Sequence, residues 1–336
     1  ARARFDPRDE RYPEMLPKVA AHFARHGVTY ALLATVASPE RRLAKVLGLL
    51  ADYIESGRNA ADGCRIGGAF IEGTWVKEAA FSGAQNPENF CEPSLDLFER
   101  LNQAARGHIR YAMIAPEWGQ SAMRLIAELS QRGVLVGAGH TAATAESYVE
   151  AVRNGLRMAV HLTNGPTGTS FKPFQGGGAL EAALTCPEVT AELIVDGFHV
   201  NPAYVLDIMK RKGPDRVCLI TDAMFAAGAE GVAEFEIERV RGAMSPNRRY
   251  LCVVGKPNTL FGSVLTTDVG FCNVVNWLTV DHAGIWTETH SAMPLDRAVL
   301  LAGRCASRNP ARVLGLLEPG RAGRGLSDCL GSLDPG

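Results

Sequence analysis

The sequence predicts an α/β fold in which parallel strands, each followed by a helix, form a barrel. Three observations support this prediction. Apolar runs of strand length alternate with amphipathic segments of helix length, the apolar runs lack polar alternation, and metal-competent side chains follow five of them. Strands buried on both faces are continuously apolar, and their alternation with helices is typical of a parallel sheet with right-handed crossovers.

The expected strands are rich in Val, Ile, Leu and Ala. They are Val28–Ala34, Ile66–Glu72, Ile109–Ala115, Val134–His140, Met158–Asn164, Ala191–Asp196 and Val217–Asp222. The expected helices between them are Tyr12–His26, Glu40–Ser56, Ser94–Ala105, Ser121–Arg132, Thr144–Asn154 and Pro202–Lys212. Such a set fits either an open doubly wound sheet or a barrel that lacks one strand. Beyond these strands, Arg248–Val254 and Thr259–Phe261 predict a hairpin instead of a βα unit.

Composition narrows the class of protein. The chain has 336 residues, of which 46% are hydrophobic, and its formal net charge of −1 gives no basic excess for nucleic acid. No apolar run is long enough to cross a membrane, and the charged N-terminus does not resemble a signal peptide. The eight cysteines contain no C-x-x-C pair. We therefore expect buried thiols in a reducing cytoplasm, with disulfides or a cysteine metal site as the alternative.

Polar side chains gather where the expected strands end. Those that follow or close a strand are Glu72, His140, His161, Asp196 with His199, and Asp222. In a parallel barrel these positions meet at the C-terminal mouth, where active sites lie. One buried histidine there is usually a hydrogen-bonded core residue, but a set of five polar strand ends predicts a shared site.

This set predicts a catalytic zinc site. Glu72, His140 and His161 supply one carboxylate and two imidazoles, which leaves a coordination position free for water. Zinc lowers the pKa of bound water to about 7, so a nucleophile exists at neutral pH. Asp222 could then take the proton of the water and give it to a leaving nitrogen. The alternative for Asp222 is a helix cap or a structural hydrogen bond.

A competing motif overlaps His140. The run Gly137-Ala138-Gly139-His140-Thr141-Ala142 matches the dinucleotide-binding pattern G-x-G-x-x-A. That pattern also requires an acidic residue at the end of the next strand, where this sequence has His161-Leu162-Thr163-Asn164. A nucleotide-binding fold is therefore disfavoured.

Several of these segments together resemble the N-acetylglucosamine-6-phosphate deacetylases of the amidohydrolase superfamily. The matching segments, in family order, are Glu72-Gly73, Asn86-Pro87, Ala115-Pro116-Glu117, Gly139-His140-Thr141-Ala142-Ala143-Thr144, His161-Leu162-Thr163-Asn164, Asp196-Gly197-Phe198-His199-Val200, Thr221-Asp222-Ala223 and Asn309-Pro310-Ala311-Arg312. The resemblance extends over roughly residues 20 to 336.

The resemblance implies a (β/α)8 TIM-type barrel, with residues 1–320 in the barrel and 321–336 starting a return to a small β-sandwich domain. The first strand and the sandwich are expected to be missing from this sequence. It also implies metal ligands at Glu72, His140 and His161, and a general acid/base at Asp222. Asn164, Gly165 and His199 correspond to substrate-binding positions. The family's enzymes are commonly homodimers.

Two departures from the family concern the substrate. Gln85 stands where the family has a histidine that polarises the amide carbonyl; its amide can donate a hydrogen bond but carries no charge. Phe171 stands where the family has a phosphate-binding arginine, so either neighbouring Lys172 replaces it or the substrate has no phosphate.

The predicted function is zinc-dependent removal of the N-acetyl group from an amino sugar, as in N-acetylglucosamine 6-phosphate, with one Zn²⁺ per chain and Asp222 and Gln85 as catalytic residues. Two alternatives stay open. One is an amidohydrolase that acts on another acylated amine or a cyclic amide. The other is a catalytically silent relative that only binds a sugar. Nucleic acid and membranes are not expected partners.

Overall fold

The computed structural model describes residues 12–164, 176–284 and 289–317. Its central feature is a curled parallel sheet in which neighbouring strands follow chain order, from β1 to β7. The strands are β1 (Tyr30–Ala34), β2 (Arg65–Trp75), β3 (Ile109–Ile114), β4 (Leu135–Ala138), β5 (Met158–Ala159), β6 (Thr190–Ile194) and β7 (Val217–Ile220). The parallel α/β fold that the sequence predicts is confirmed.

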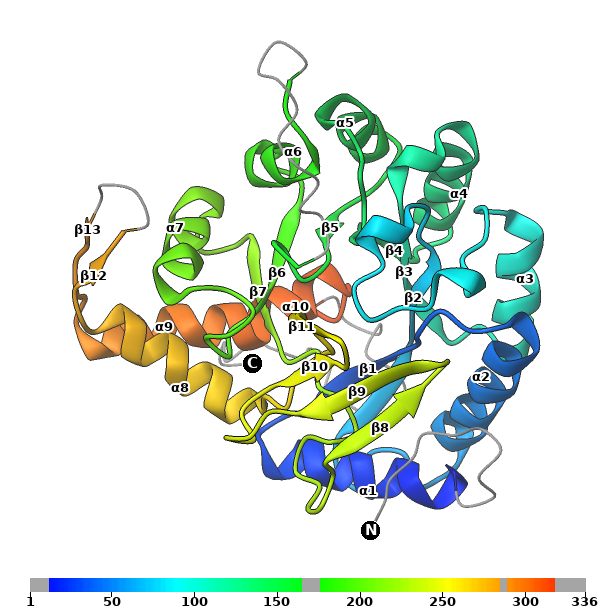
Figure 1. The fold of residues 1–336 in the computed structure, drawn as a ribbon, viewed down its shortest axis with the longest axis horizontal. Helices are drawn as coiled ribbons and strands as arrows, with labels where there is room; N and C mark the ends of the chain where they lie inside the picture. The colour runs from blue at the N-terminus through cyan, green and yellow to red at the C-terminus, as the bar shows by residue number, and fades with distance from the viewer. Residues whose placement is uncertain (1–11, 165–175, 285–288, 318–336) are drawn as a thin grey trace.

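Helices surround the strands in chain order, as Figure 1 shows. They are α1 (Tyr12–Arg25), α2 (Glu40–Glu55), α3 (Leu95–Ala104), α4 (Gln120–Gln131), α5 (Ala145–Arg153), α6 (Ala179–Thr185), α7 (Pro202–Lys212), α8 (Thr267–Leu278), α9 (Leu295–Gly303) and α10 (Asn309–Val313). Local sequence explains several starts: the side chains of Ser94, Thr144 and Asn201 accept backbone hydrogen bonds at the N-termini of α3, α5 and α7.

The main core lies between the sheet and these helices. Its side chains are almost all aliphatic, and Trp75 and Tyr148 are the largest that are fully buried. Burying such side chains contributes about 1.5–3 kcal/mol each relative to leaving them in water. A second, smaller cluster fills the inside of the curled sheet and includes Phe70, Tyr111, Met158 and Cys218.

The expected strand ends need correction. Strand β2 continues to Trp75, three residues beyond Glu72, whereas β4, β5, β6 and β7 each end two residues before the polar side chain expected to close them. The register of β2 against β3 shifts between Ile71 and Trp75, which lets β2 run on past Glu72. In β4, β5 and β7 the following polar residue has a positive φ, which cannot continue a strand.

A four-stranded antiparallel sheet follows β7. It consists of β8 (Glu234–Ile237), β9 (Val240–Met244), β10 (Leu251–Val253) and β11 (Lys256–Leu260), in the order β11-β10-β9-β8. The predicted hairpin is its β10–β11 pair, with both strands shorter than or shifted from the predicted ranges. The first pair, β8–β9, was not expected, because its strands are short and charged on the exposed face.

The remaining elements are small. A two-stranded sheet pairs β12 (His282–Ala283) with β13 (Thr289–His290), and short 3₁₀ helices cover Ala79–Phe81, Pro87–Asn89 and Pro116–Trp118. Within the described ranges, no helix combines the length and the apolar character that crossing a bilayer requires. The expected β-domain segment 321–336 lies outside the described residues, and the division at residue 320 stays a prediction.

Candidate metal centre and active site

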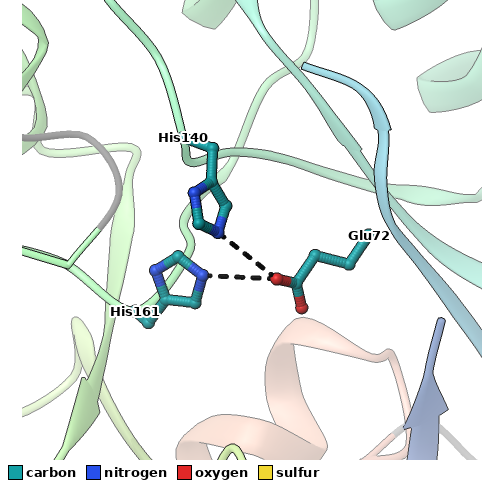
Figure 2. A group of neighbouring side chains, drawn as sticks. All are labelled: Glu72, His140 and His161. Carbon is teal, nitrogen blue, oxygen red and sulfur yellow. Dashed lines mark ion pairs between the residues drawn. The ribbon is translucent and has the colours of Figure 1, made fainter. Parts of the chain in front are cut away.

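Glu72, His140 and His161 point toward one another at one end of the curled sheet (Figure 2). One carboxylate oxygen, Oε1 of Glu72, lies 3.5 Å from Nε2 of His140 and 3.5 Å from Nε2 of His161. All three side chains are buried, and one potential ligand atom from each lies within 4.8 Å of the others.

The backbone places these side chains by leaving the strand conformation. His140 has a φ of 49°, His161 of 31° and Asp222 of 47°. Such left-handed values are uncommon outside glycine, and they persist only where the surrounding structure enforces them. Residues strained in this way concentrate at functional sites, which is where these three lie.

The trio fits a tetrahedral metal ion. Bonds of about 2.0–2.1 Å from zinc to nitrogen or oxygen place neighbouring ligand atoms about 3.4 Å apart in a tetrahedron. The two 3.5 Å separations match that spacing. Nδ1 of His140 lies 2.8 Å from the carbonyl oxygen of Phe81, which accepts a hydrogen bond from the Nδ1–H and leaves Nε2 free to bind a metal.

Gln85 holds the carboxylate of this trio. Its Nε2 donates to Oε1 of Glu72 at 3.2 Å, and its own Oε1 accepts from the backbone N–H of Ala37 at 2.7 Å. Gly73, with a φ of 84°, passes so close that a Cβ there would lie 2.6 Å from Oε1 of Gln85. Both polar atoms of the Gln85 amide are therefore engaged in positioning Glu72, a use that the sequence did not reveal.

The protonation of the trio suits cation binding. Burial alone would raise the pKa of Glu72, but His140 and His161 oppose that effect and lower it to about 2. Burial would lower the pKa of His161, and Glu72 instead raises it to about 9. Without a metal, Glu72 is thus an anion beside a protonated imidazole, and a bound cation would replace that proton.

Asp222 stands two residues beyond β7 at the same end of the barrel. Its main chain is fixed, because its carbonyl oxygen accepts from the N–H of Ser263 at 2.8 Å. Burial, followed by the negative charge of Glu72, raises the pKa of the Asp222 carboxyl to about 6. A carboxyl with such a pKa can exchange protons near neutral pH, as general acid/base catalysis requires.

His199 is oriented by Asp196. The carboxylate Oδ2 of Asp196 lies 2.7 Å from Nδ1 of His199, and Oδ1 accepts from the N–H groups of Phe198 and His199. Burial would raise the pKa of Asp196, but these contacts with His199 lower it. The arrangement fixes Nδ1 on the carboxylate and leaves Nε2 of His199 for another partner.

These side chains border one cavity of about 1510 Å³ that reaches into the barrel. The predicted site residues that line it are Glu72, Gln85, His140, His161, Asn164, His199 and Asp222. The two others, Gly165 and Lys172, lie outside the described residues. The cavity is larger than the roughly 300–1,000 Å³ of a typical small-molecule pocket, so a sugar would occupy only part of it.

Two further carboxyls of this region, the half-buried Glu117 and the buried Glu192, were not predicted as site residues. Glu117 binds the hydroxyl of Thr141 and, at 2.8 Å, the N–H of Ala142, and so ties down the loop that carries His140. Glu192 lies in the middle of β6, and burial raises its pKa to about 7. The available signal was a lone acidic residue within the otherwise apolar segment Ala191–Val195.

Known deacetylases are similar to this chain in sequence. The chain is 32% identical over 326 residues to the N-acetylgalactosamine-6-phosphate deacetylase of Escherichia coli O157:H7, with 96% of the chain and 75% of that protein aligned. It is 30% identical over 307 residues to the N-acetylglucosamine-6-phosphate deacetylase of Vibrio furnissii, with 90% and 68% aligned. No family model matches the chain.

A solved structure gives the same result. The match is a mutant of the N-acetyl-D-glucosamine-6-phosphate deacetylase of Mycobacterium smegmatis in complex with N-acetyl-D-glucosamine-6-phosphate. It has a TM-score of 0.75 and 31% identity, over 89% of this chain and 71% of that one. Fold and sequence therefore define a hydrolase of the amidohydrolase superfamily. The chain belongs to the N-acetylglucosamine-6-phosphate deacetylase family, which confirms the resemblance.

Proposed function

We propose that this protein removes the acetyl group from an N-acetyl amino sugar 6-phosphate in a metal-dependent hydrolysis that yields the free amine and acetate. The observation that carries the proposal is the buried trio of Glu72, His140 and His161, which shares a cavity with Asp222. The relative at 32% identity is an N-acetylgalactosamine-6-phosphate deacetylase, and the relative at 30% identity is an N-acetylglucosamine-6-phosphate deacetylase. The natural sugar is one of this class.

The trio would hold one zinc ion per chain. Two imidazole nitrogens and one carboxylate suit zinc and leave a position open for water. When bound, the metal supplies an acidified water as nucleophile and polarises the acetyl carbonyl. Gln85 keeps Oε1 of Glu72 turned toward the two histidines. With its amide engaged there, Gln85 acts on the reaction by positioning Glu72, and any contact with the carbonyl oxygen would need its second N–H.

Asp222 moves the proton. As a carboxylate it accepts a proton from the attacking water, and as a carboxylic acid it gives that proton to the sugar nitrogen when the C–N bond breaks. His199, fixed by Asp196, donates or accepts a hydrogen bond on the sugar through Nε2. We place Asn164 and Gly165 beside the sugar and Lys172 at its anionic end.

We further propose that the protein is a homodimer in the cytoplasm. The seven described cysteines are all unpaired, which suits a reducing compartment.

A substrate panel tests the proposal. Purified protein is offered N-acetylglucosamine 6-phosphate, N-acetylgalactosamine 6-phosphate, N-acetylglucosamine, an N-acetyl amino acid and a cyclic amide, and product is assayed. We expect acetate release with the highest kcat/KM on a phosphosugar. Hydrolysis of only the amino acid or the cyclic amide would reassign the substrate. Sugar binding without turnover of any compound would instead support a catalytically silent relative that only binds a sugar.

The dependence of the rate on pH follows from Asp222. The base must be ionised, so the active form increases as pH rises through its pKa. That pKa is about 6 in the metal-free site, where burial and the charge of Glu72 raise it, and a bound cation would lower it. We expect kcat/KM to fall about tenfold for each pH unit below the pKa and to level off above it. Rates from pH 4.5 to 8, with metal content measured at each pH, check this. A flat profile at constant metal content would remove Asp222 as the base.

Lys18, Arg25 and Arg42 line the cavity among the described residues. We propose Arg249, which lies beside the segment that carries His199, as the alternative to Lys172 for the substrate's phosphate. Its guanidinium carbon lies 4.9 Å from the ring centre of Phe198, the residue before His199 and part of the cavity lining. A charge-assisted contact with phosphate contributes about 1.5–3 kcal/mol. Arg249→Ala should therefore raise KM for the phosphosugar by about tenfold or more and leave kcat and the unphosphorylated sugar unchanged.

The matched control is Arg248→Ala. Arg248 lies in the same turn, but its guanidinium donates to the carbonyl oxygen of Ala229 at 3.3 Å. This variant should keep the phosphosugar KM. If Lys172→Ala raises the KM for the phosphosugar selectively and Arg249→Ala does not, Lys172 binds the phosphate.

A further inference from the structure

Below the metal trio, the inside of the barrel is apolar except for one carboxyl. The cluster there contains Phe70, Tyr111, Met158 and Cys218, and Glu192 of β6 projects among these residues, with only 8% of its surface exposed. Among the described residues no cation pairs with Glu192 within ion-pair distance. A buried ionisable group in such surroundings is costly unless it has a partner, so its presence needs an explanation.

Glu192 lies next to His161. Strands β5 and β6 pair through Ala159 and Ala191, and the N–H of Leu162 donates to the carbonyl oxygen of Glu192 at 2.7 Å. His161 directs Nε2 at Glu72, whereas its other ring nitrogen, Nδ1, is buried and has no hydrogen-bond partner. His140 differs here, because the carbonyl of Phe81 accepts from its Nδ1.

A second polar atom faces the same carboxyl. Tyr111 of β3 stacks on Phe70, with ring centres 4.0 Å apart, and its buried hydroxyl makes no close, well-aligned hydrogen bond with any described group. Burial, the nearby charge of Glu192 and the interaction of the hydroxyl with that side chain all raise the pKa of the hydroxyl. Gly137 leaves room for it, since a Cβ there would lie 2.6 Å from the hydroxyl oxygen. Tyr111, His161 and Glu192 all line the cavity.

Nδ1 of His161, the Tyr111 hydroxyl and the Glu192 carboxyl thus belong to one buried region. The hydroxyl and the carboxyl interact with each other, whereas Nδ1 of His161 has no partner among the described residues. A metal-binding histidine almost always donates its second N–H to a carboxylate, a carbonyl or a water. A buried water typically makes about three hydrogen bonds to groups that otherwise lack partners. The unpaired Nδ1, the hydroxyl and the carboxyl provide that number and the required mixture of donors and acceptors.

We propose that Glu192 is a positioning residue for the metal ligand His161. Together with the Tyr111 hydroxyl it would hold a buried water that accepts a hydrogen bond from the Nδ1–H of His161 and so directs the Nε2 lone pair at the metal. The inference rests on the metal centre of the proposed function and adds a structural origin for the affinity of that centre.

Metal affinity of the full chain is the decisive measurement. Zn²⁺ affinity is obtained by competition with a chromophoric chelator, and the dissociation rate by transfer to excess chelator. Losing such a partner typically costs 10–100-fold in metal affinity. We expect Glu192→Ala to lose affinity in that range with faster dissociation, and Glu192→Gln to lose less. Tyr111→Phe, which removes one neutral hydrogen bond, should lose about fivefold.

Cys218→Ala is the matched control, because it opens the same apolar cluster on the neighbouring strand β7 without removing a hydrogen-bonding carboxyl. It should keep the affinity within about twofold. The visible spectrum of the Co²⁺-loaded protein adds a ligand-geometry readout, which should change for Glu192→Gln and stay unchanged for Cys218→Ala. If Glu192→Ala does not fold, the Zn²⁺ affinities and Co²⁺ spectra of Glu192→Gln and Tyr111→Phe test the inference.

Two results would overturn the inference. One is wild-type affinity and Co²⁺ spectrum for both Glu192→Gln and Tyr111→Phe. The other is an equal loss in Cys218→Ala, which would indicate general loosening of the barrel. None of these measurements uses turnover. A protein that fails to release acetate but shows the expected affinity pattern would sink the proposed substrate and leave the role of Glu192 standing.

Discussion

Replacement of Asp222 by Asn is expected to reduce kcat on the best substrate by about 10³-fold or more while the protein keeps its metal. The amide has nearly the shape of the carboxyl but cannot take a proton from water or return one to the leaving nitrogen. General acid/base catalysis alone is typically responsible for 10²–10⁴-fold, and here one group performs both transfers. Single-turnover acetate release and metal content, measured on the same sample, check the result.

Asp196→Asn is the appropriate comparison. It removes a carboxylate that follows β6, the strand next to β7. That carboxylate contacts His199 and two backbone N–H groups instead of the metal trio. This variant should mainly raise KM, because His199 loses its orientation. An Asp222→Asn protein that is both metal-loaded and active would assign the proton transfer to another group.

Loss of the metal is the second large expected effect. His161→Ala removes one of the three ligands, so metal content should fall from about one per chain to a small fraction, and the rate by about 10³-fold or more. Elemental analysis after gel filtration, together with acetate release, measures both quantities.

The same variant provides a stability check. Ligand binding to the native state stabilises it, so added Zn²⁺ should raise the melting temperature of the wild-type protein and not that of His161→Ala. Wild-type metal content and zinc-dependent melting in His161→Ala would mean that the metal binds elsewhere.

Much of the fold could be predicted because it depends on local pattern. The helices α2 and α7 begin at the predicted residues, and α7 ends there too, since amphipathic spacing and an N-terminal Asn201 or Pro39 mark them in the sequence. The strand ends were less predictable. A positive φ at His140 or His161 is enforced by tertiary contacts, and the local sequence does not predict it.

The gathering of Glu72, His140 and His161 could be anticipated for a topological reason: the C-terminal ends of parallel barrel strands meet. The role of Gln85 in positioning Glu72 could not be anticipated. Its hydrogen bond to Glu72 depends on the close passage of Gly73 and Ala37, which lie on different segments. Glu192 and Tyr111 were missed because strands β3 and β6 bring them together only across the barrel interior.

The most direct measurement of the central claim is acetate release from N-acetylglucosamine 6-phosphate by wild-type protein stripped with a chelator and then titrated with Zn²⁺. We expect a stripped protein without activity and a rate that rises with added metal to a plateau at about one equivalent per chain. A stripped protein that retains its full rate, or a zinc-loaded one that releases no acetate from any amino sugar, would contradict it.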